Sequence, residues 1–337
     1  MRKATSGTAP VTMRRIAEAC GVSRPAVSMI LGGKGQAFSA ELRERVQRTA
    51  RELGYRPNQG AYAVKTGRFG ALALLLDQDC YLPPALLRAL TAACSRRGLH
   101  LVVADCSDGQ LLAEESKLLS HLLADGLLLN RISVPTPAVL RRLDAHPLPV
   151  CWLNQRLGRG CVLPDDPEAL RRLVAELVAR GHRRIAYSEL TRSAHGHASE
   201  DDRREGYLAG MRAHGLDPIL WSERADSGEQ RVAVALRQLR EPERPDALLC
   251  YGGRGMYPYL AAALRLGLEI PRDLSLAACL ETFHHDDTGL VLGGLLTPWE
   301  AIAEAAVARL AAGERDTADL AVPYGAFMPG QTVGVRG

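Results

Sequence analysis

Short apolar runs alternate with amphipathic helical segments from about residue 70 to the end of the chain, and this alternation most constrains the fold. Strands are expected at residues 71–76, 100–104, 126–129, 149–153, 184–187, 246–250, 274–279 and 291–296. Helices between them include residues 84–97, 112–124, 167–180, 202–214, 228–239, 257–266 and 298–312. Because parallel strands need long crossovers, usually helices, the alternation predicts parallel sheets covered by helices.

The helix expected at 167–180 has the clearest pattern of these. Asp166 is the expected N-cap and Pro167 the first helical residue, and an apolar stripe then runs to Gly181. The doublet Asp165-Asp166 is therefore interpreted as a helix cap rather than a catalytic pair.

Residues 11–56 have a different pattern, that of three short helices. Thr12, Ser23 and Ser39 are the expected N-caps, and Gly21 supplies the left-handed residue after the first helix. Residues 57–68 then form a predicted hinge, because Pro57 stops the third helix. Two helices joined by a tight turn and supported by a third predict a helix-turn-helix domain.

The charge of the chain is divided unevenly between these two parts. Residues 1–70 contain 13 basic and four acidic residues, whereas residues 71–337 contain 29 basic and 34 acidic ones. A basic head on a slightly acidic body indicates a polyanion-binding module joined to another domain.

Several classes of protein are excluded. No apolar run approaches the ~20 residues of a membrane span, and residues 1–10, an expected disordered tail, lack the apolar core of a signal peptide. The eight cysteines are scattered and form no CxxC pair, which is typical of free thiols in the cytoplasm. We expect no cofactor, no metal and no contact with a membrane.

Short motifs in both parts of the chain carry a family pattern. In the head these are residues 11–17 (VTMRRIA), 21–23 (GVS), 26–28 (AVS), 45–46 (RV), 50–58 (ARELGYRPN) and 66–68 (TGR). In the body they include 124–126 (ADG), 180–186 (RGHRRIA), Arg203 with Gly206-Tyr207, and 270–273 (IPRD). With these motifs the chain resembles the lactose-repressor/galactose-repressor (LacI/GalR) family of transcription regulators. The resemblance implies a dimeric repressor whose α/β core is periplasmic-binding-protein-like, with two parallel-sheet subdomains and an effector cleft between them.

The resemblance also implies how the core, residues 69–337, divides. Subdomain 1 is expected at about 69–161 and 291–320, and subdomain 2 at about 162–290 and 321–337.

The second helix of the head is the expected recognition helix. Its outward positions are expected to be Arg24, Ala26, Ser28 and Met29, with Arg24 suited to guanine and the Ala26 methyl to thymine. Arg14 and Lys34 are among the candidates for phosphate contacts. The remaining DNA-site candidates are Thr12, Ser23, Tyr55, Asn58, Ala61 and Val64.

The hinge departs from the family pattern at 61–64 (AYAV). Relatives have a leucine that wedges into the minor groove where this chain has Val64, which is shorter and β-branched. Val64 is expected either to act as a weaker wedge or to pack in the dimer.

The effector cleft also departs from the family. Arg203 matches the family's ligand arginine, but Gly252-Gly253 stands for an Asn-Asp pair and Asn154-Gln155 for Asp-Arg. A site that loses its hydrogen-bonding groups loses discrimination for hydroxyls, so a hexose effector is not expected. The candidate lining is Tyr81, Asn130, Trp152, Asn154, Asp165, Arg203, Arg254, Glu281 and Trp299.

Other classes of function find less support. The segments 195–197 (HGH) and 284–287 (HHDD) match no metal-ligand spacing, and residues 252–255 (GGRG) are not a dinucleotide loop. An enzyme or a solute-binding protein on the α/β core stays as the alternative. The sequence therefore predicts a non-enzymatic, cytoplasmic regulator that binds a pseudo-palindromic operator as a homodimer, with a tetramer as the larger assembly and a cleft without effector as a variant.

Overall fold

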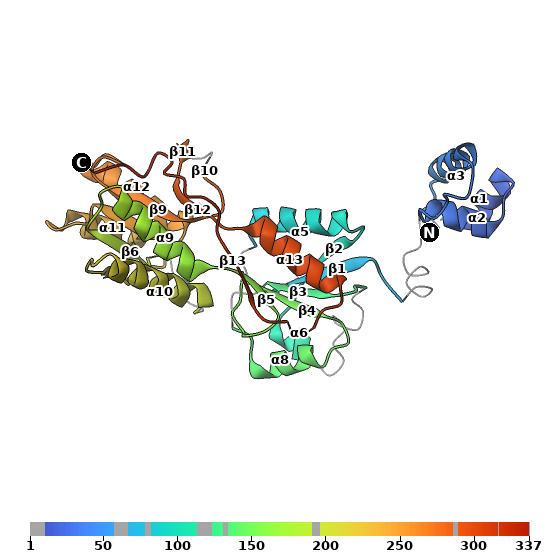
Figure 1. Ribbon diagram of the computed structural model, residues 1–337, viewed down its shortest axis with the longest axis horizontal. Helices are drawn as coiled ribbons and strands as arrows, with labels where there is room; N and C mark the ends of the chain where they lie inside the picture. The colour runs from blue at the N-terminus through green and yellow to red at the C-terminus, as the bar shows by residue number, and fades with distance from the viewer. Residues whose placement is uncertain are drawn as a thin grey trace, which may run out of the picture. The chain divides into compact units, whose positions relative to one another are not determined.

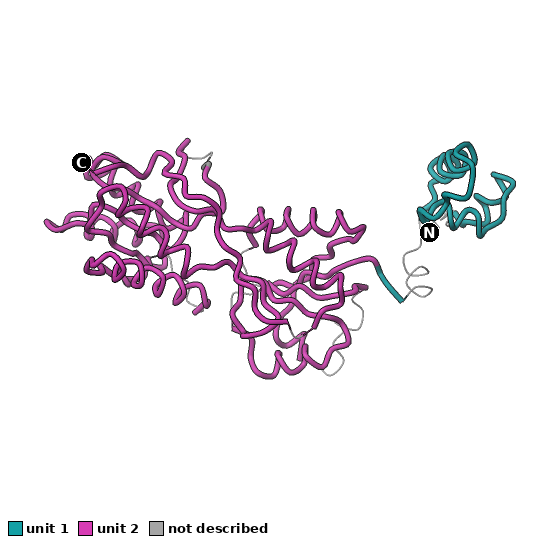
Figure 2. The backbone as a smooth tube through the Cα atoms, viewed as in Figure 1, with its two compact units in different colours: residues 1–69 teal, residues 70–337 magenta. Residues whose placement is uncertain are grey.

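The computed structural model describes residues 11–56, 67–77, 82–112, 123–130, 134–190, 196–285, 289–315 and 317–336, with 284 and 285 described in their backbone alone. The chain divides into two compact units, residues 1–69 and 70–337 (Figure 2). Within the described residues no helix has both the length and the apolar character needed to cross a membrane.

The first unit is a three-helix domain, as predicted. Its helices are α1 (Met13–Cys20), α2 (Arg24–Leu31) and α3 (Ala40–Glu52). Ile16, Val27 and Val46, one from each helix, are completely buried and form the centre of the core.

Local capping explains where these helices begin and end. The Ser23 hydroxyl accepts from the Ala26 backbone N–H at 3.3 Å, and the Ser39 hydroxyl accepts from that of Leu42 at 3.2 Å. Gly21 has a φ of 64°, the left-handed conformation expected there. The prediction that Thr12 caps α1 with its side chain was wrong. Thr12 is at the N-cap position, but its side chain makes no capping hydrogen bond, and its carbonyl oxygen accepts from backbone N–H groups of α1.

The second unit contains two parallel sheets with helices on their faces (Figure 1). The first sheet contains β1 (Ala71–Leu76), β2 (His100–Asp105), β3 (Leu127–Asn130), β4 (Val150–Leu153), β5 (Cys161–Pro164) and β13 (Leu320–Val322). Its helices are α5 (Pro84–Arg96), α6 (Asp108–Leu112), α8 (Pro137–Asp144) and α13 (Trp299–Ala311).

The second sheet contains β6 (Ile185–Ser188), β7 (Ile219–Trp221), β8 (Ala247–Cys250), β9 (Ser275–Leu280) and β12 (Gly293–Leu296). Its helices are α9 (Asp166–Ala179), α10 (Ala198–Ala213), α11 (Gly228–Arg240) and α12 (Gly253–Leu266). The strands β10 (His284–His285) and β11 (Leu290–Val291) form a separate antiparallel pair. The predicted fold class, a helix-turn-helix domain and a core of two parallel-sheet subdomains, is confirmed.

The strand order shows where the chain crosses between the two sheets. The first sheet has the order β13-β5-β4-β3-β1-β2 and the second β12-β9-β8-β6-β7. The predicted subdomain ranges differ from this order at three strands. β12 belongs to the second sheet, although residues 291–320 were predicted for subdomain 1. β5 and β13 belong to the first sheet, although residues 162–164 and 321–322 were predicted for subdomain 2. Leu320, Ala321 and Val322 of β13 pair in parallel with residues 162–164 of β5, so the chain returns to the first sheet after β12.

The elements that were not predicted from the sequence include the strands β5, β7, β10 and β13 and the helices α6 and α8. The helix expected at 112–124 falls mainly on residues 113–122, which lie outside the described residues. The described cysteines are all buried free thiols, at positions 20, 94, 106, 151, 161, 250 and 279.

Candidate functional sites

The outer face of α2 presents the candidate base-reading side chains. Arg24 is exposed, Met29 is 43% exposed and Ser28 is half-buried. Ala26 was wrongly predicted to be exposed, because it is buried in α2 with only 7% of its surface exposed. Arg24, Ser28 and Met29 are therefore the side chains of this group that α2 offers to a partner.

The other DNA-site candidates of the head differ in whether protein groups already contact their side chains. Thr12 and Lys34 are exposed, while Arg14 donates to the exposed carboxylate of Glu18 at 2.9 Å. The Ser23 hydroxyl is occupied as the cap of α2. Such an exposed ion pair contributes little to stability, so Arg14 can exchange Glu18 for a phosphate at low cost.

Tyr55, near the end of the domain, is partly buried against the core that α1, α2 and α3 share. Burial raises the pKa of the Tyr55 hydroxyl, and the charge of Arg24 opposes that rise. The two side chains therefore lie in one electrostatic neighbourhood. Asn58, Ala61 and Val64, the other hinge candidates, lie outside the described residues.

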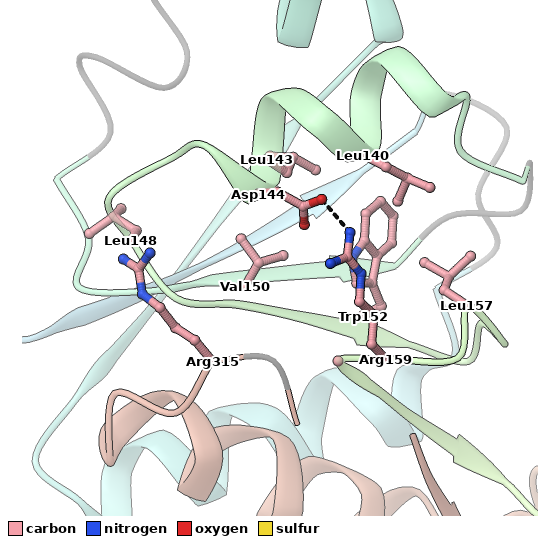
Figure 3. Close-up of a pocket in the computed structure, with 10 residues that line it drawn as sticks. Leu140, Leu143, Asp144, Leu148, Val150, Trp152, Leu157, Arg159 and Arg315 are labelled. Atoms are coloured by element: carbon pink, nitrogen blue, oxygen red, sulfur yellow. Dashed lines mark hydrogen bonds and ion pairs between the residues drawn. The ribbon is translucent and has the colours of Figure 1, made fainter. Parts of the chain in front are cut away.

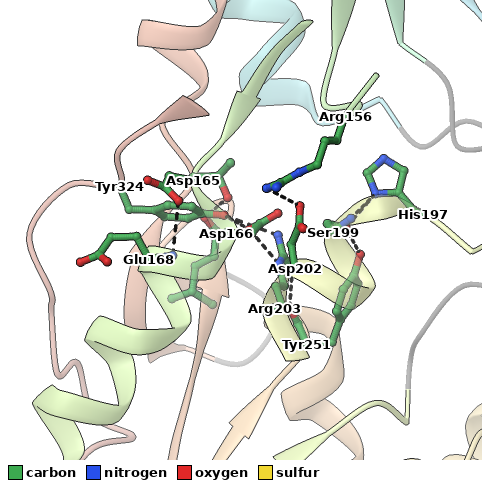
Figure 4. A network of polar contacts seen from close by, with 12 residues as sticks. Arg156, Asp165, Asp166, Glu168, His197, Ser199, Asp202, Arg203, Tyr251 and Tyr324 are labelled. Carbon is green, nitrogen blue, oxygen red and sulfur yellow. Dashed lines mark hydrogen bonds and ion pairs between the residues drawn. The ribbon is translucent and has the colours of Figure 1, made fainter. Parts of the chain in front are cut away.

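A second polar site lies in the second unit, around the side chain of Arg203 on α10. The Arg203 Nε donates to the Asp166 carboxylate at 2.9 Å, and Asp166 also accepts from the Tyr324 hydroxyl at 2.7 Å (Figure 4). The side chains of Arg203 and Asp166 are 12% and 3% exposed. We call the group formed by Asp166, Arg203, Tyr251 and Tyr324 the arginine network.

Tyr251 contacts Arg203 in two ways. Its backbone carbonyl accepts from Nη1, and the guanidinium carbon lies 4.6 Å from the centre of its ring. Nη2 lies 3.5 Å from the Tyr324 hydroxyl, so acceptors lie on three sides of the guanidinium. A buried charge of this kind needs such partners, because desolvation alone would cost several kcal/mol.

The two tyrosine hydroxyls of the arginine network have raised pKa values. Burial is the main cause for both Tyr324 and Tyr251, whereas the positive charge of Arg203 works in the opposite direction. Both hydroxyls therefore stay protonated near neutral pH. The Tyr251 hydroxyl in turn lies 2.6 Å from the Ser199 hydroxyl, which lies 2.7 Å from the His197 ring.

The prediction that Asp166 caps α9 was wrong. Asp165 is the N-cap, and its side chain accepts from the Glu168 backbone N–H at 3.3 Å. Asp166 is the first helical residue and directs its carboxylate at Arg203.

An ion pair links a loop of the first sheet to a helix of the second. Arg156, in the connection between β4 and β5, lies 3.0 Å from the Asp202 carboxylate on α10. Burial raises the pKa of Asp202 to about 6, and Arg156 opposes the rise. Asp166 and Glu205 add smaller contributions that raise it further.

The predicted effector residues do not all gather in this site. Asn130 ends β3 and is buried, Asn154 follows β4 with a φ of 55°, and Glu281 is exposed after β9. Arg254 is exposed in the first turn of α12. Tyr81 lies outside the described residues.

Two tryptophans predicted for the cleft belong to hydrophobic clusters instead. Trp152 packs with residues of α8, on the opposite face of β4 from Cys151 and Leu153. Trp299, at the start of α13, is 7% exposed and packs with α5 and the first sheet. Of the predicted cleft residues, Arg203 is the one that the arginine network contains.

Sequence reasoning missed Asp166, Tyr251, Tyr324, Asp202 and Arg156 as site residues. The one signal available was the doublet Asp165-Asp166, since a single acidic residue suffices for a cap. His197, considered as a metal ligand, is the buried N-cap of α10, and its ring accepts from the Ser199 backbone N–H. His195 lies outside the described residues.

Comparison with known proteins gives two family matches. Residues 12–58 match the model described as bacterial regulatory proteins, lacI family, and residues 174–331 match a periplasmic binding protein-like domain. Together the two matches cover the three-helix unit and most of the second half of the chain.

Curated relatives align along most of the chain. The HTH-type transcriptional regulator GntR of Escherichia coli is 27% identical over 89% of this chain and 91% of its own. PtxS of Pseudomonas plecoglossicida is 29% identical over 88% and 87%, and the maltose regulon regulatory protein MalI of E. coli is 29% identical over 72% and 71%.

Solved structures share the fold. The lac repressor dimer bound to operator and the anti-inducer ONPF has a TM-score of 0.74 at 21% identity, covering 97% of this chain and 100% of its own. The complex of the transcriptional regulator CelR with cellobiose has a TM-score of 0.62 at 22% identity, covering 96% and 99%.

Proposed function

Because this chain belongs to the lacI family of bacterial regulatory proteins, we propose that it represses transcription by binding one operator sequence as a homodimer. The observation that carries this proposal is the three-helix unit, whose α2 buries Val27 and Ile30 and presents Arg24, Ser28 and Met29 outward. Side chains on such a helix are suited to base edges in the major groove.

Each side chain on α2 has a distinct role in the proposal. Arg24 donates to guanine O6 and N7, and Met29 makes an apolar contact with a neighbouring base. Arg14, Lys34 and Thr12 bind phosphates and hold the domain in register. Two such domains related by a two-fold axis read a pseudo-palindromic site in the cytoplasm.

The core is proposed to bind a small effector between its two subdomains, and that effector is not a typical hexose. Gly252 and Gly253 offer no side-chain hydrogen bonds at the end of β8, and Arg203 is already in contact with Asp166 and Tyr324. An effector that changes the closure of the subdomains changes operator affinity, because the two equilibria are linked.

A core without any effector is the second candidate. It is favoured by the arginine network, in which protein groups occupy the positions around the guanidinium that a ligand would need. In that case the dimer represses constitutively.

Selection of bound fragments from the native genome tests the main proposal. The full-length protein is expected to enrich one pseudo-palindromic sequence, whose affinity falls steeply with salt as phosphate contacts are lost. The variant Ile16→Asp, which places a charge in the core of the three-helix unit, is expected to lose this binding. Enrichment of no sequence, or retained binding by Ile16→Asp, contradicts the proposal.

Thermal shift with a library of small metabolites separates the two candidates for the core. A compound that raises the midpoint of the second unit and changes operator affinity supports effector gating. A compound that raises this midpoint but leaves operator affinity unchanged contradicts effector gating.

A further inference from the structure

A small pocket lies between α8 and the first sheet, and none of its residues belongs to the arginine network. Its cavity has a volume of about 90 Å³. Leu143 of α8, Val150 and Trp152 of β4 and Leu157 of the following loop form its apolar wall (Figure 3). Two arginines, Arg159 and Arg315, complete the lining at its edge.

The aromatic wall of this pocket is Trp152, only 5% of which is exposed. Gly160 lies against the indole, since a Cβ at this position would be 3.9 Å from Cδ1 of Trp152. Gly160 has a φ of 69°, a conformation that glycine adopts without strain, and the loop can therefore turn tightly beside the ring. In this pocket the backbone at Gly160 therefore lies close to the indole ring of Trp152.

The charged edge of the pocket is built from two distant segments. Arg159 precedes β5 and forms an ion pair with Asp144 at the end of α8. Arg315 follows α13, and its Nη1 donates to the His146 carbonyl oxygen at 3.3 Å. Among the pocket-lining residues, the two arginines stand against a single carboxylate, that of Asp144, which Arg159 contacts.

The surroundings strengthen this positive potential. Burial lowers the pKa of His146, and the charges of Arg142 and Arg315 lower it further. Arg141 and Arg142 both lie in the last turn of α8. The arginines at this edge therefore outnumber its one lining carboxylate, Asp144, which favours an anion over a cation.

We propose that this pocket is a second ligand site, for a small carboxylic acid with an apolar ring. The ring packs against Trp152 and the leucines, and the carboxylate lies between Arg159 and Arg315. The small cavity, about 90 Å³, favours a single ring with few substituents over bulky acids. Guanidiniums bind carboxylates through paired N–H donors, which favours an acid over a neutral ligand of the same shape.

Titration of the full-length protein with 4-fluorobenzoate, followed by fluorine NMR, tests the site. We expect saturable binding, weakened about tenfold by Arg159→Gln and about tenfold by Arg315→Gln, because each removes one charge-assisted hydrogen bond. Arg212→Gln, at an exposed arginine in the last turn of α10, is the matched control and is expected to bind like the unchanged protein.

Two further ligands sharpen the result. Methyl 4-fluorobenzoate has the same ring without the charge and is expected to bind at least tenfold more weakly. Inorganic phosphate is expected not to displace 4-fluorobenzoate, because it has no apolar part. Equal binding of the ester, full displacement by phosphate, affinity unchanged in both arginine variants, or no saturable signal each overturns the proposal.

Discussion

The two units of the chain each place an arginine at the centre of a proposed site, and the two arginines differ in their surroundings. Arg24 on α2 is exposed to solvent, whereas the side chain of Arg203 on α10 is 12% exposed and contacts Asp166, Tyr251 and Tyr324. An exposed guanidinium is ready for an external partner, while a buried one is held by the protein itself. The second therefore holds segments of the core together, and the first is the one proposed for recognition of DNA.

This difference predicts that substitutions in the two units change different quantities. In the head, the removal of a functional side chain should change DNA affinity and leave folding stability almost unchanged. In the arginine network, the removal of one partner leaves a buried charge without compensation and should change stability first.

The largest effect is expected for Asp166→Ala. Loss of this carboxylate leaves the buried guanidinium of Arg203 unpaired and should lower the free energy of unfolding by about 3–5 kcal/mol. Urea unfolding followed by tryptophan fluorescence measures the second unit alone, because Trp152, Trp221 and Trp299 all lie in it.

Asp165→Ala is the matched control for this experiment. It removes only the cap of α9 and should cost about 1 kcal/mol. Equal losses for the two variants would show that Asp166 acts as an ordinary residue of the helix terminus.

A smaller effect, on binding rather than stability, is expected for Arg24→Ala. Operator affinity should fall by about 1–3 kcal/mol, roughly 5- to 150-fold, with specificity relaxed at one base pair. Fluorescence anisotropy with the selected duplex measures this loss. Arg48→Ala, at an exposed position of α3, provides the comparison.

The specificity of the loss decides how Arg24 acts. A uniform loss across all duplexes would mean that Arg24 binds phosphate and reads no base. A loss confined to duplexes with one particular base pair supports direct readout.

The pH dependence of the core should show Asp202. Its folded-state pKa of about 6 lies above the ordinary value of 3.8, so the folded protein binds this proton more tightly than the unfolded chain does. This carboxyl's contribution to stability is therefore fully present below pH ~4 and is lost as the pH rises to ~6, by on the order of 1–2 kcal/mol.

Asp202→Asn tests this contribution, because an amide does not titrate. The difference in unfolding free energy between the two proteins should change between pH 4 and 6 and be constant above pH 7. A constant difference throughout that range would assign the pH dependence of the core to other groups.

The contrast between the units also explains which features were predictable from sequence. The helices of the head begin and end close to the predicted residues, because Ser23, Gly21 and Ser39 act on neighbours within a few positions. Signals of this kind are local, and a single sequence contains them completely.

The core depends instead on partners that are distant along the chain. β5 contains a proline and is four residues long, and it becomes a strand between β4 and β13. Asp166 was interpreted as a cap because its partners, Arg203 and Tyr324, lie 37 and 158 positions away. Parallel sheets bring such residues together at strand ends, and the spacing of the residues does not indicate which of them meet.

The smallest change in stability is expected for Thr12→Ala, within ~0.5 kcal/mol, because the Thr12 side chain makes no capping hydrogen bond. Ser39→Ala should cost about 1 kcal/mol, since the Ser39 hydroxyl caps α3. Amide hydrogen exchange of α1 and α3 in the full chain measures both. If Thr12 binds phosphate, Thr12→Ala should still weaken DNA binding several-fold across all duplexes. A loss of stability equal to that of Ser39→Ala, with unchanged DNA affinity, would assign Thr12 to the cap and remove it from the interface.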